Sequence, residues 1–450
     1  MLISTAFAFV GSAVFAENRD VAEDESGSWT VMVYICGDNN LEPYALSDLE
    51  EMEKVGSKND VTIVVLMDTF ELLEGTHWYV VEEGSDHVDI DAGTHTCDCH
   101  EVTGGSCPGE LDMGDGNTLT NFVVTAVTYS PADHYMLVLW DHGGGWRGVC
   151  WDDTTVINDL GWYSRLTTPE TADALEAAQE EIREDIDPDF KITILGYDAC
   201  LNGMIEVIYE NRNIADYMFA SINLVPVDGM AYDLFLAEMT KSPRPSIEDI
   251  GKAIVDSYVE YYSNLASPTG QGLEYFADCT LSFFQLGEPV TNLVSDIDAL
   301  AHELINGGYL DEGSYRGAIS SAESQTPRIP TYSGEQIPFI DLGLYAAALA
   351  ENIPELAGLA GAVAGGVDEV VVYENHMTTP GGGILRTSGM SVMFTWSFEY
   401  LNPAYGFEDY EDAEPTGNTL YYGMAFVVDT WWDEFVFTFC QAYVAEIDLD

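Results

Sequence analysis

The sequence predicts an α/β fold: a mostly parallel central sheet between two layers of helices, with a smaller C-terminal α+β region. Short apolar, β-branched runs alternate with longer segments of helical spacing, as in strand–helix–strand units. The runs are apolar throughout, which is typical of strands buried on both faces. Two motifs rich in reactive side chains, DHGGG and DAC, directly follow such runs, where parallel sheets place their functional groups.

The first half of the chain supplies most of this sheet. The run WTVMVYIC at 29–36 predicts a buried strand that ends at the turn residues GDNN. A helix follows at 43–55, because apolar residues recur there at helical spacing between acidic ones. The further strands expected are 61–67, 77–81, 134–140, 192–196 and 217–221, and the further helices are 119–129, 169–185 and one that begins near Leu201.

The chain divides into four expected parts. Residues 1–16 form an uncharged apolar run that ends in small residues, which predicts a signal peptide and therefore a secreted, extracellular protein. This run has no basic n-region, and a buried N-terminal strand or helix is the alternative. An acidic linker at 17–28 precedes the main domain at 29–267.

The last part, 268–450, is less regular, and we expect it to complete or flank the sheet. It holds expected helices at 288–304 and 339–349, expected strands at 369–373 and 390–394, and then a tyrosine-rich acidic insertion. No internal repeat is evident.

The charge of the chain excludes two classes of partner. Asp and Glu number 78 against 14 Lys and Arg, a formal charge of -64. Such a chain repels nucleic acid and anionic membranes, and its few cations release few counterions. The excess charge suits solubility in a salty or extracellular medium, or it attracts cationic substrates. No run beyond the first is long and apolar enough to cross a bilayer, so we expect a soluble protein after signal cleavage. We also expect a monomer.

Three of the eight cysteines cluster in HTCDCHEVTGGSC at 95–107. These are Cys97, Cys99 and Cys107, with His95 and His100 beside them. Thiolates and imidazoles can bind zinc, but the C-x-C spacing differs from the usual C-x2-C knuckle. In a secreted chain disulfides are the preferred interpretation, zinc stays open as the alternative, and we predict no metal site.

His142 and Cys200 have the residue types that nucleophilic catalysis by a thiol needs. Both follow expected buried strands, and the ends of adjacent parallel strands converge. Cys200 is expected to precede a helix whose N-terminus favours a thiolate. The glycines after His142 leave the backbone N–H of Gly143 open to a substrate carbonyl. The alternative is a structural cysteine and a hydrogen-bonded histidine.

Several ordered motifs carry a more specific resemblance. The runs WTVMVYICGDNNLE, YSPADHYMLVLWDHGGGW, ILGYDACLNGMIEVIYE and ASINLVPVDGMAY, between about residues 29 and 240, resemble the clostripain family of cysteine peptidases. This resemblance implies a caspase-like three-layer α/β/α fold. It also implies His142 as the general acid/base and Cys200 as the nucleophile, with the N–H groups of Gly143 and Cys200 as the oxyanion hole.

The resemblance also implies an acidic S1 pocket that selects Arg or Lys before the scissile bond, in protein or peptide substrates. The matching positions are Asp198 and Asp228. A carboxylate in a partly desolvated pocket favours a cation over apolar side chains. Asp198 can instead orient its loop, and Asp228 can form a turn. This sequence departs from the family at Met230, where Trp is usual, and at Asn223, near a position that is often Glu.

Members of the family are often activated by self-cleavage between the histidine and the cysteine, sometimes with calcium. Arg147 and Arg165, in expected loops, are the candidate sites, and Arg183 and Lys191 are the other basic residues in the interval. The chemistry requires no cofactor, and calcium is the one ion that the resemblance suggests.

Two rival functions remain open: an inactive binding protein on the same fold, and an HGGG-type esterase. The esterase would need a G-x-S-x-G elbow, which the sequence lacks.

Overall fold

A computed structural model describes residues 27–70, 75–89, 94–156, 163–265, 279–330, 336–377, 386–395 and 417–447. The expected signal peptide, nearly all of the expected acidic linker and the tyrosine-rich insertion lie outside these ranges. Among the helices described, none combines the length and the apolar character that a membrane span requires.

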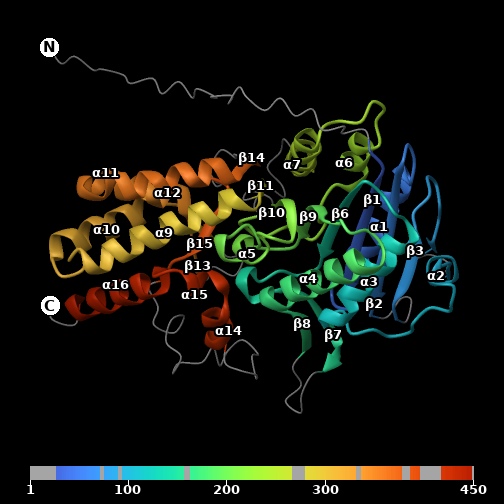
Figure 1. Cartoon of the computed structure of the whole chain (residues 1–450), viewed down its shortest axis with the longest axis horizontal. Helices are drawn as coiled ribbons and strands as arrows, with labels where there is room; N and C mark the ends of the chain where they lie inside the picture. Colours follow the sequence, from blue (N-terminus) through green and yellow to red (C-terminus); the bar gives the residue numbers. More distant parts are fainter. Residues whose placement is uncertain are drawn as a thin grey trace.

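Eight strands form the main sheet in the order β14-β11-β10-β9-β6-β1-β2-β3. The five strands from β10 to β2 are parallel, and β3, β11 and β14 are antiparallel to their neighbours. Figure 1 shows this sheet crossing the molecule. Its strands are β1 (Trp29–Gly37), β2 (Val61–Thr69), β3 (His77–Val80), β6 (His134–Trp140), β9 (Ile192–Asp198), β10 (Ala215–Ala220), β11 (Thr280–Gln285) and β14 (Val371–His376).

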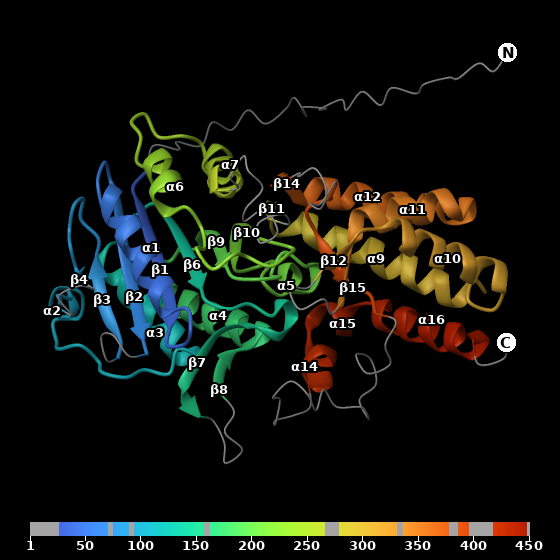
Figure 2. The same ribbon diagram turned by 180° about the vertical axis from the view of Figure 1, so that it is seen from behind.

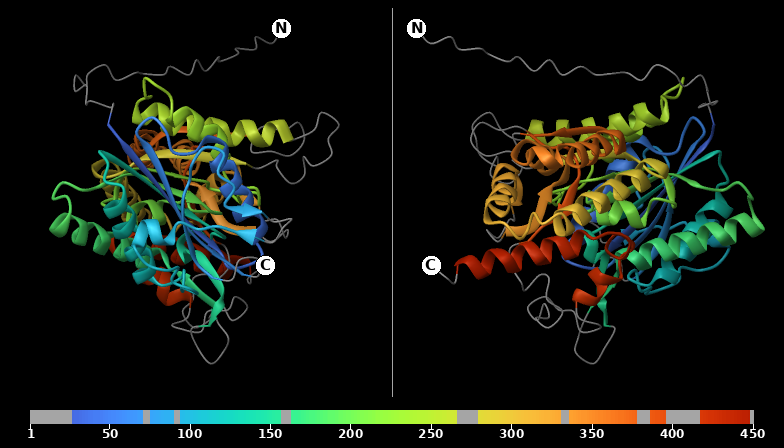
Figure 3. Two further views of the ribbon diagram at one scale, coloured as in Figure 1. Left: turned by 90° about the vertical axis from the view of Figure 1, so that its right-hand side faces the viewer. Right: turned by 60° about the vertical axis from the view of Figure 1, so that its left-hand side comes forward.

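Helices cover both faces of the sheet, because successive side chains of a strand point to opposite sides. In β1, Met32 and Tyr34 belong to the core beneath α3, α4 and α5, whereas Val31 and Val33 belong to the core beneath α1, α6 and α7. Figure 3 shows α7 and α4 on opposite sides of the sheet. These helices are α1 (Glu42–Val55), α3 (Gly116–Tyr129), α4 (Thr168–Asp185), α5 (Ile205–Glu210), α6 (Tyr232–Met239) and α7 (Ile247–Leu265). The predicted three-layer α/β/α fold is confirmed.

Local sequence sets where these helices begin. Among α3, α4 and α5, the longest helix is α4, which begins with a capping box: the N–H of Glu170 donates to the hydroxyl oxygen of Thr167, and the N–H of Thr167 donates to the carboxylate of Glu170. Asp115 caps α3 by accepting a hydrogen bond from the N–H of Asn117. Short elements connect the layers: β4 (Val88–Asp89), β5 (Thr94–His95), α2 (Cys99–Thr103), the 3-10 turn η1 (Gly145–Arg147), and the hairpin β7 (Val149–Val156) with β8 (Tyr163–Leu166).

The C-terminal half adds a helical layer at the end of the molecule away from β1, β2 and β3 (Figure 2). It contains α9 (Glu288–Asn306), α10 (Gly313–Gln325), α11 (Leu342–Asn352), η2 (Pro354–Leu356), α12 (Ala357–Val370), α14 (Gly417–Gly423), α15 (Ala425–Asp429) and α16 (Trp432–Ile447). A small sheet of β12 (Arg328–Pro330), β13 (Gln336–Asp341) and β15 (Ser391–Met393) lies among them. The N–H of Ser391 donates to the carbonyl of Gly203, so this sheet contacts the loop that follows Cys200.

Two of the expected helices differ from the structure. The helix expected from Leu201 begins only at Ile205, because Leu201 has φ 71° and the chain turns before α5. The helix expected at 339–349 is wrong over its first three residues, which belong to β13; α11 begins at Leu342 after Asp341 caps it. The junction was not predicted because apolar residues continue from the strand into the helix with no turn residues between them.

Candidate active site

The register of two central strands brings the expected histidine and cysteine to one edge of the sheet. Trp140 of β6 pairs with Asp198 of β9 across a parallel ladder. His142 and Cys200 each lie two residues beyond these paired positions, and the N–H of Asp141 donates to the carbonyl of Asp198 at 3.3 Å. His142 and Cys200 line the same cleft, together with Trp140 and Asp198.

The thiol of Cys200 is half-buried beneath the loop that follows β10. It donates to the carbonyl of Val225 at 3.7 Å, and the N–H of Val225 donates back to the sulfur at 3.3 Å. Burial raises the pKa of the Cys200 thiol to about 11, although the N–H groups of Val225 and Gly143 oppose this rise. The resting site therefore holds a protonated thiol, which needs a base for activation.

The histidine expected as that base contacts a residue from the loop after β1. Nε2 of His142 lies 2.9 Å from Oδ1 of Asn40. An amide oxygen can only accept, so Nε2 carries the proton and Nδ1 is the ring nitrogen able to take one from a thiol. Burial lowers the pKa of His142, so the imidazole is neutral and basic at neutral pH.

A hydrogen-bonded network joins this histidine loop to β1 and to β7. Nδ2 of Asn39 donates to Oδ1 of Asp141 at 2.7 Å and to the carbonyl of Trp151 at 3.0 Å. The N–H of Trp151 donates to the other oxygen of Asp141. Because Asp141 precedes His142 directly, these bonds fix the backbone from which the imidazole projects.

Gly143 fits closely against the backbone of Cys200. A Cβ at this position would lie 2.3 Å from the carbonyl oxygen of Cys200 and 2.5 Å from its nitrogen. Only glycine lets the two backbones approach this closely, and the N–H of Gly143 reaches the sulfur of Cys200. Both N–H groups expected in the oxyanion hole therefore lie beside the thiol.

Buried carboxylates form the floor of the cleft. Asp198 is 3% exposed, and its Oδ2 accepts from the N–H of Met230 at 3.0 Å and from the hydroxyl of Tyr232 at 3.1 Å. Asp48, 2% exposed, lies behind it and accepts from the indole of Trp140 at 2.6 Å. A Cβ on Gly229, at φ 61°, would lie 2.8 Å from Oδ2 of Asp198 and 3.0 Å from Oδ2 of Asp48.

These carboxylates share a low-dielectric environment. Burial raises the pKa of Asp198 to about 6, and burial together with the neighbouring Asp198 raises that of Asp48. Asp228 is half-buried, with a pKa raised by burial, and its neighbours Val227 and Gly229 line the cleft. Met230 and Asn223, the two positions at which this sequence departs from the family, are both buried. The backbone carbonyl of Asn223 accepts a hydrogen bond from the N–H of Leu201.

The expected helix-dipole activation of Cys200 is wrong. The helix begins five residues after the thiol and has only 6 residues, so its N-terminus does not act on the sulfur. Backbone N–H groups of Gly143 and Val225 are the observed donors instead. Asn40, Asp48 and the Asn39–Asp141 pair were missed, although the GDNN motif follows a strand as the functional motifs do.

Of the four basic residues between His142 and Cys200, the three arginines lie in helices or strands, and Lys191 directly precedes β9. Arg147 ends the turn η1 and Arg165 belongs to β8, so the expectation that Arg165 is in a loop is wrong. The two are linked, since Nε of Arg165 donates to the carbonyl of Arg147 at 3.3 Å. Arg183 donates to the carbonyl of Phe190, and Lys191 pairs with Asp216.

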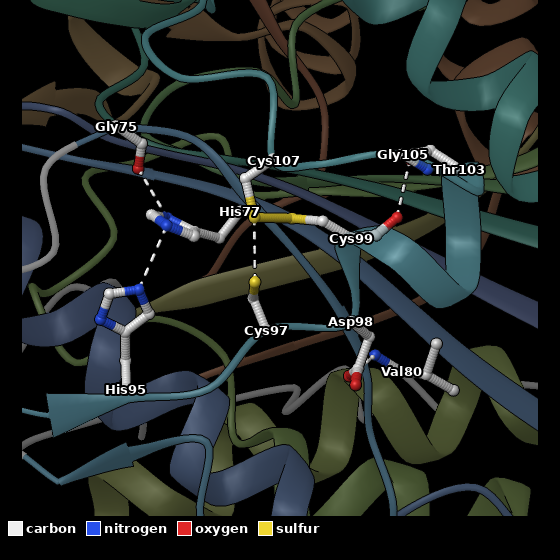
Figure 4. The surroundings of a disulfide bond; sticks show 10 residues. All are labelled: Gly75, His77, Val80, His95, Cys97, Asp98, Cys99, Thr103, Gly105 and Cys107. Carbon is white, nitrogen blue, oxygen red and sulfur yellow. Dashed lines mark hydrogen bonds between the residues drawn. A yellow bond between two sulfur atoms is a disulfide. The ribbon is translucent and has the colours of Figure 1, made fainter.

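The cysteine cluster contains a disulfide. Cys99 is bonded to Cys107, and Cys97 keeps a thiol whose sulfur lies 2.9 Å from that of Cys107 (Figure 4). Nearby, His77 and His95 lie ring to ring, with their Nε2 atoms 3.2 Å apart. The structure thus favours the disulfide over zinc at this position.

Fold and site together define the class of this protein: a three-layer α/β/α protein built like a caspase-type cysteine peptidase. Its sequence matches the clostripain family, Peptidase_C11, over residues 33–434. The chain therefore belongs to the clostripain family.

Individual relatives agree with this assignment. The chain is 30% identical over 226 residues to clostripain from Hathewaya histolytica, a match that covers 45% of this chain and only 40% of that protein. A secreted C11 cysteine protease from Bacteroides thetaiotaomicron, solved with an irreversible peptide inhibitor, superposes with a TM-score of 0.59 at 19% identity, covering 90% of this chain and 99% of that one.

A second solved structure has the same fold. An inactive zymogen C11 protease from Parabacteroides distasonis superposes with a TM-score of 0.60 at 17% identity, covering 89% of this chain and 97% of that one. At this level of identity the two structures support the fold alone.

Proposed function

We propose that this protein is a secreted cysteine endopeptidase that cleaves protein or peptide chains after Arg or Lys through a His142/Cys200 dyad. The observation that carries the proposal is the convergence of these two side chains in one cleft, beside the N–H of Gly143. His142 takes the thiol proton as the sulfur attacks the scissile carbonyl, then returns it to the leaving amine. The N–H groups of Gly143 and Cys200 stabilise the oxyanion.

The preference for a basic residue rests on Asp198, with Asp228 near the cleft mouth. A cationic side chain entering the cleft would favour the ionised form of Asp198, whose pKa burial raises to about 6. An apolar side chain would leave this buried carboxylate without compensation, so the pocket discriminates by charge.

Short fluorogenic peptides that end in Arg, Lys, Ala or Asp test the proposal. We expect release from the Arg and Lys peptides, no release by Cys200→Ala, and loss of activity on thiol alkylation. Asp198→Asn should lower kcat/KM for the Arg peptide by at least about tenfold, roughly 1.4 kcal/mol, with a smaller effect on the Ala peptide. A folded wild type that cleaves none of them would instead be an inactive binding protein.

Self-processing between His142 and Cys200 is part of the proposal. Cleavage after Arg147 or Arg165 requires local opening of the β7–β8 hairpin, since both residues lie in ordered elements. Wild type and Cys200→Ala compared on a denaturing gel decide this, because identical uncut bands would show a single-chain enzyme. The dyad chemistry itself requires no cofactor. We also propose that residues 1–16 are a signal peptide and that 29–267 form the catalytic domain, which 268–450 completes.

A further inference from the structure

Three sulfur atoms lie together beside the outer edge of the main sheet. Cys99 and Cys107 form a disulfide, and the sulfur of Cys97 lies 2.9 Å from that of Cys107. Figure 4 shows Cys97 beside the Cys107 end of this disulfide. Each of the three sulfurs lies within 4.8 Å of the other two; Cys99 is buried, whereas Cys97 and Cys107 are half-buried. The cleft that holds His142 and Cys200 is lined by other residues.

The segment that carries these cysteines covers the edge of the sheet. Among the described strands, β3 is the last in the order of the main sheet, so one of its sides has no neighbouring strand. The N–H of Asp98 donates to the carbonyl of Trp78 at 2.8 Å, and the carboxylate of Asp98 accepts from the N–H of Val80 at 2.8 Å. Just before β3, the N–H of Thr76 donates to the carbonyl of Gly109 at 2.9 Å. Residues 98–109 therefore satisfy backbone groups that a bare edge strand would expose to other chains.

The backbone beside Cys97 is anchored to the rest of the domain. The N–H of Thr96 donates to the carbonyl of His87 at 2.8 Å. One residue earlier, Nε2 of His95 lies 3.2 Å from Nε2 of His77, the first residue of β3. Because this segment is held in place, the thiol of Cys97 stays beside the disulfide at a high effective concentration.

We propose that Cys97, Cys99 and Cys107 form a thiol–disulfide exchange site, in which Cys107 pairs with either Cys99 or Cys97. The thiolate of Cys97 attacks the sulfur of Cys107. A Cys97–Cys107 bond forms as the Cys99–Cys107 bond breaks, and the bonding electron pair leaves on the sulfur of Cys99. Cys97 loses its proton to solvent, and Cys99 takes one up. One disulfide and one thiol are present before and after the step, so it needs no oxidant or reductant.

Either pairing keeps the cover on β3. Cys97 and Cys99 flank Asp98, which bonds to the strand, and Cys107 lies two residues before Gly109, which bonds to the chain just before it. Both disulfides therefore tie the same two segments together. When a low-molecular-weight thiol attacks Cys107 and displaces Cys99, the thiolate of Cys97 attacks the resulting mixed disulfide and expels that thiol. The exchange site thus preserves the covalent tie under mildly reducing conditions, and it does not rest on the proposed function.

The pairing is mapped on the full-length Cys200→Ala protein, purified without reductant, so that self-cleavage does not affect the result. The protein is held at about pH 8, where thiols ionise more readily, and is then denatured in excess N-ethylmaleimide. The reagent alkylates whichever cysteine of the cluster lies outside the disulfide, and mass spectrometry of peptic peptides locates it. We expect two populations: Cys97 alkylated beside a Cys99–Cys107 disulfide, and Cys99 alkylated beside a Cys97–Cys107 disulfide.

Single variants of this parent test each sulfur in turn. Cys99→Ala should form the Cys97–Cys107 disulfide, Cys97→Ala should keep the Cys99–Cys107 disulfide, and both should melt within a few degrees of the parent. Cys107→Ala removes the sulfur that both pairings share, so it should melt lowest. Ser106→Ala, at an exposed position of the same loop, is the matched control and should show both populations, as the parent does.

A parent in which only Cys97 is alkylated would overturn the proposal, whether or not the Cys99→Ala variant folds. A folded Cys99→Ala protein with Cys97 and Cys107 both alkylated would overturn it as well. Elemental analysis of the parent gives a third outcome, because bound zinc with all three thiols reduced would make the cluster a metal site instead. Both populations in a protein whose wild type cleaves no peptide would support the exchange site and remove only the proposed function.

Discussion

Asn40 and His142, 102 residues apart in the sequence, meet through a 2.9 Å contact between an amide oxygen and Nε2 of the imidazole. The contact joins the loop after β1 to the loop after β6, so loops from two neighbouring strands together hold the orientation of the His142 ring. It also sets the tautomer, because the amide oxygen requires a protonated Nε2. In the proposed dyad, Nδ1 is therefore the ring nitrogen that accepts the thiol proton.

Asn40→Ala should therefore lower kcat by about 10- to 100-fold, roughly 1.4–2.7 kcal/mol, because the imidazole loses its orientation and tautomer. KM should change little, since Asn40 does not line the cleft. Steady-state kinetics on an Arg peptide measures both constants. Asn306→Ala, at the exposed end of α9, is the control and should behave as wild type. An unchanged kcat in Asn40→Ala would remove the positioning role.

Cys200 should react with iodoacetamide at a rate that keeps rising between pH 6 and pH 9. Burial raises the pKa of this thiol to about 11, so the thiolate fraction grows throughout that range. Cys200→Ser is measured in parallel to subtract the other free cysteines, four of which are buried. A plateau near neutral pH would instead indicate a preformed thiolate–imidazolium pair.

Gly143→Ala should abolish most activity while the protein still folds. The added methyl would lie 2.3 Å from the carbonyl oxygen of Cys200, so one of the two backbones must move and the oxyanion site opens. We expect kcat to fall by at least about 100-fold, roughly 2.7 kcal/mol. Gly144→Ala is the matched control, because its nearest contacts are side-chain atoms at 3.1 Å. Equal activity of the two variants would contradict this role of Gly143.

The sequence predicted the central sheet well, because strands buried on both faces are recognisable from unbroken apolar runs. Expected strands such as 134–140 match β6 at both ends. The common position of His142 and Cys200 in one cleft could also be predicted, since both follow such runs closely. The start of the helix after Cys200 could not be predicted. Leu201 adopts a positive φ and its N–H donates to the carbonyl of Asn223 in a distant loop, so the helix begins later, at Ile205.

Contacts between segments that are distant in the sequence could not be predicted, because no local sequence pattern indicates them. Asp48 is a helix residue at a polar position of an amphipathic pattern, yet it is buried because Trp140 donates to it from β6. Asp38, Asp68 and Asp152 are also buried, although they look like surface acids in so acidic a chain. Their burial becomes evident only when β7 lies against the ends of β1 and β2.

Glu206, in the short helix α5 that follows Cys200, shows how the C-terminal half contributes to stability. Its side chain is 0% exposed, and its Oε1 accepts from the N–H of Met393 at 2.9 Å and from the hydroxyl of Tyr421 at 3.4 Å. Oε2 has no partner among the described residues. Burial raises the pKa of Glu206 to about 7, so the carboxyl group of the folded protein is mostly protonated below that pH.

The sign of the resulting pH dependence follows from linkage. Because the folded pKa lies above the unfolded value of 4.5, the stability that protonation provides is present at low pH and is lost as pH rises from about 4.5 to about 7. Glu206→Gln should remove this loss, because an amide can keep both hydrogen bonds without a charge. Relative to wild type, it should gain up to roughly 3 kcal/mol between pH 4.5 and pH 8.

Urea denaturation of the Cys200→Ala parent and of the Glu206→Gln variant at pH 5 and pH 8 measures this difference. Taking the difference between variants cancels the other titrating groups, which both proteins share. Glu180→Gln, on the exposed face of α4, is the control and should follow the parent at both pH values. If the free energies of unfolding of Glu206→Gln and the parent differ by the same amount at pH 5 and pH 8, the pKa of Glu206 is not raised by folding. The carboxyl group is then ionised in the folded protein, and its charge at the contact between α5 and β15 must be compensated by other groups.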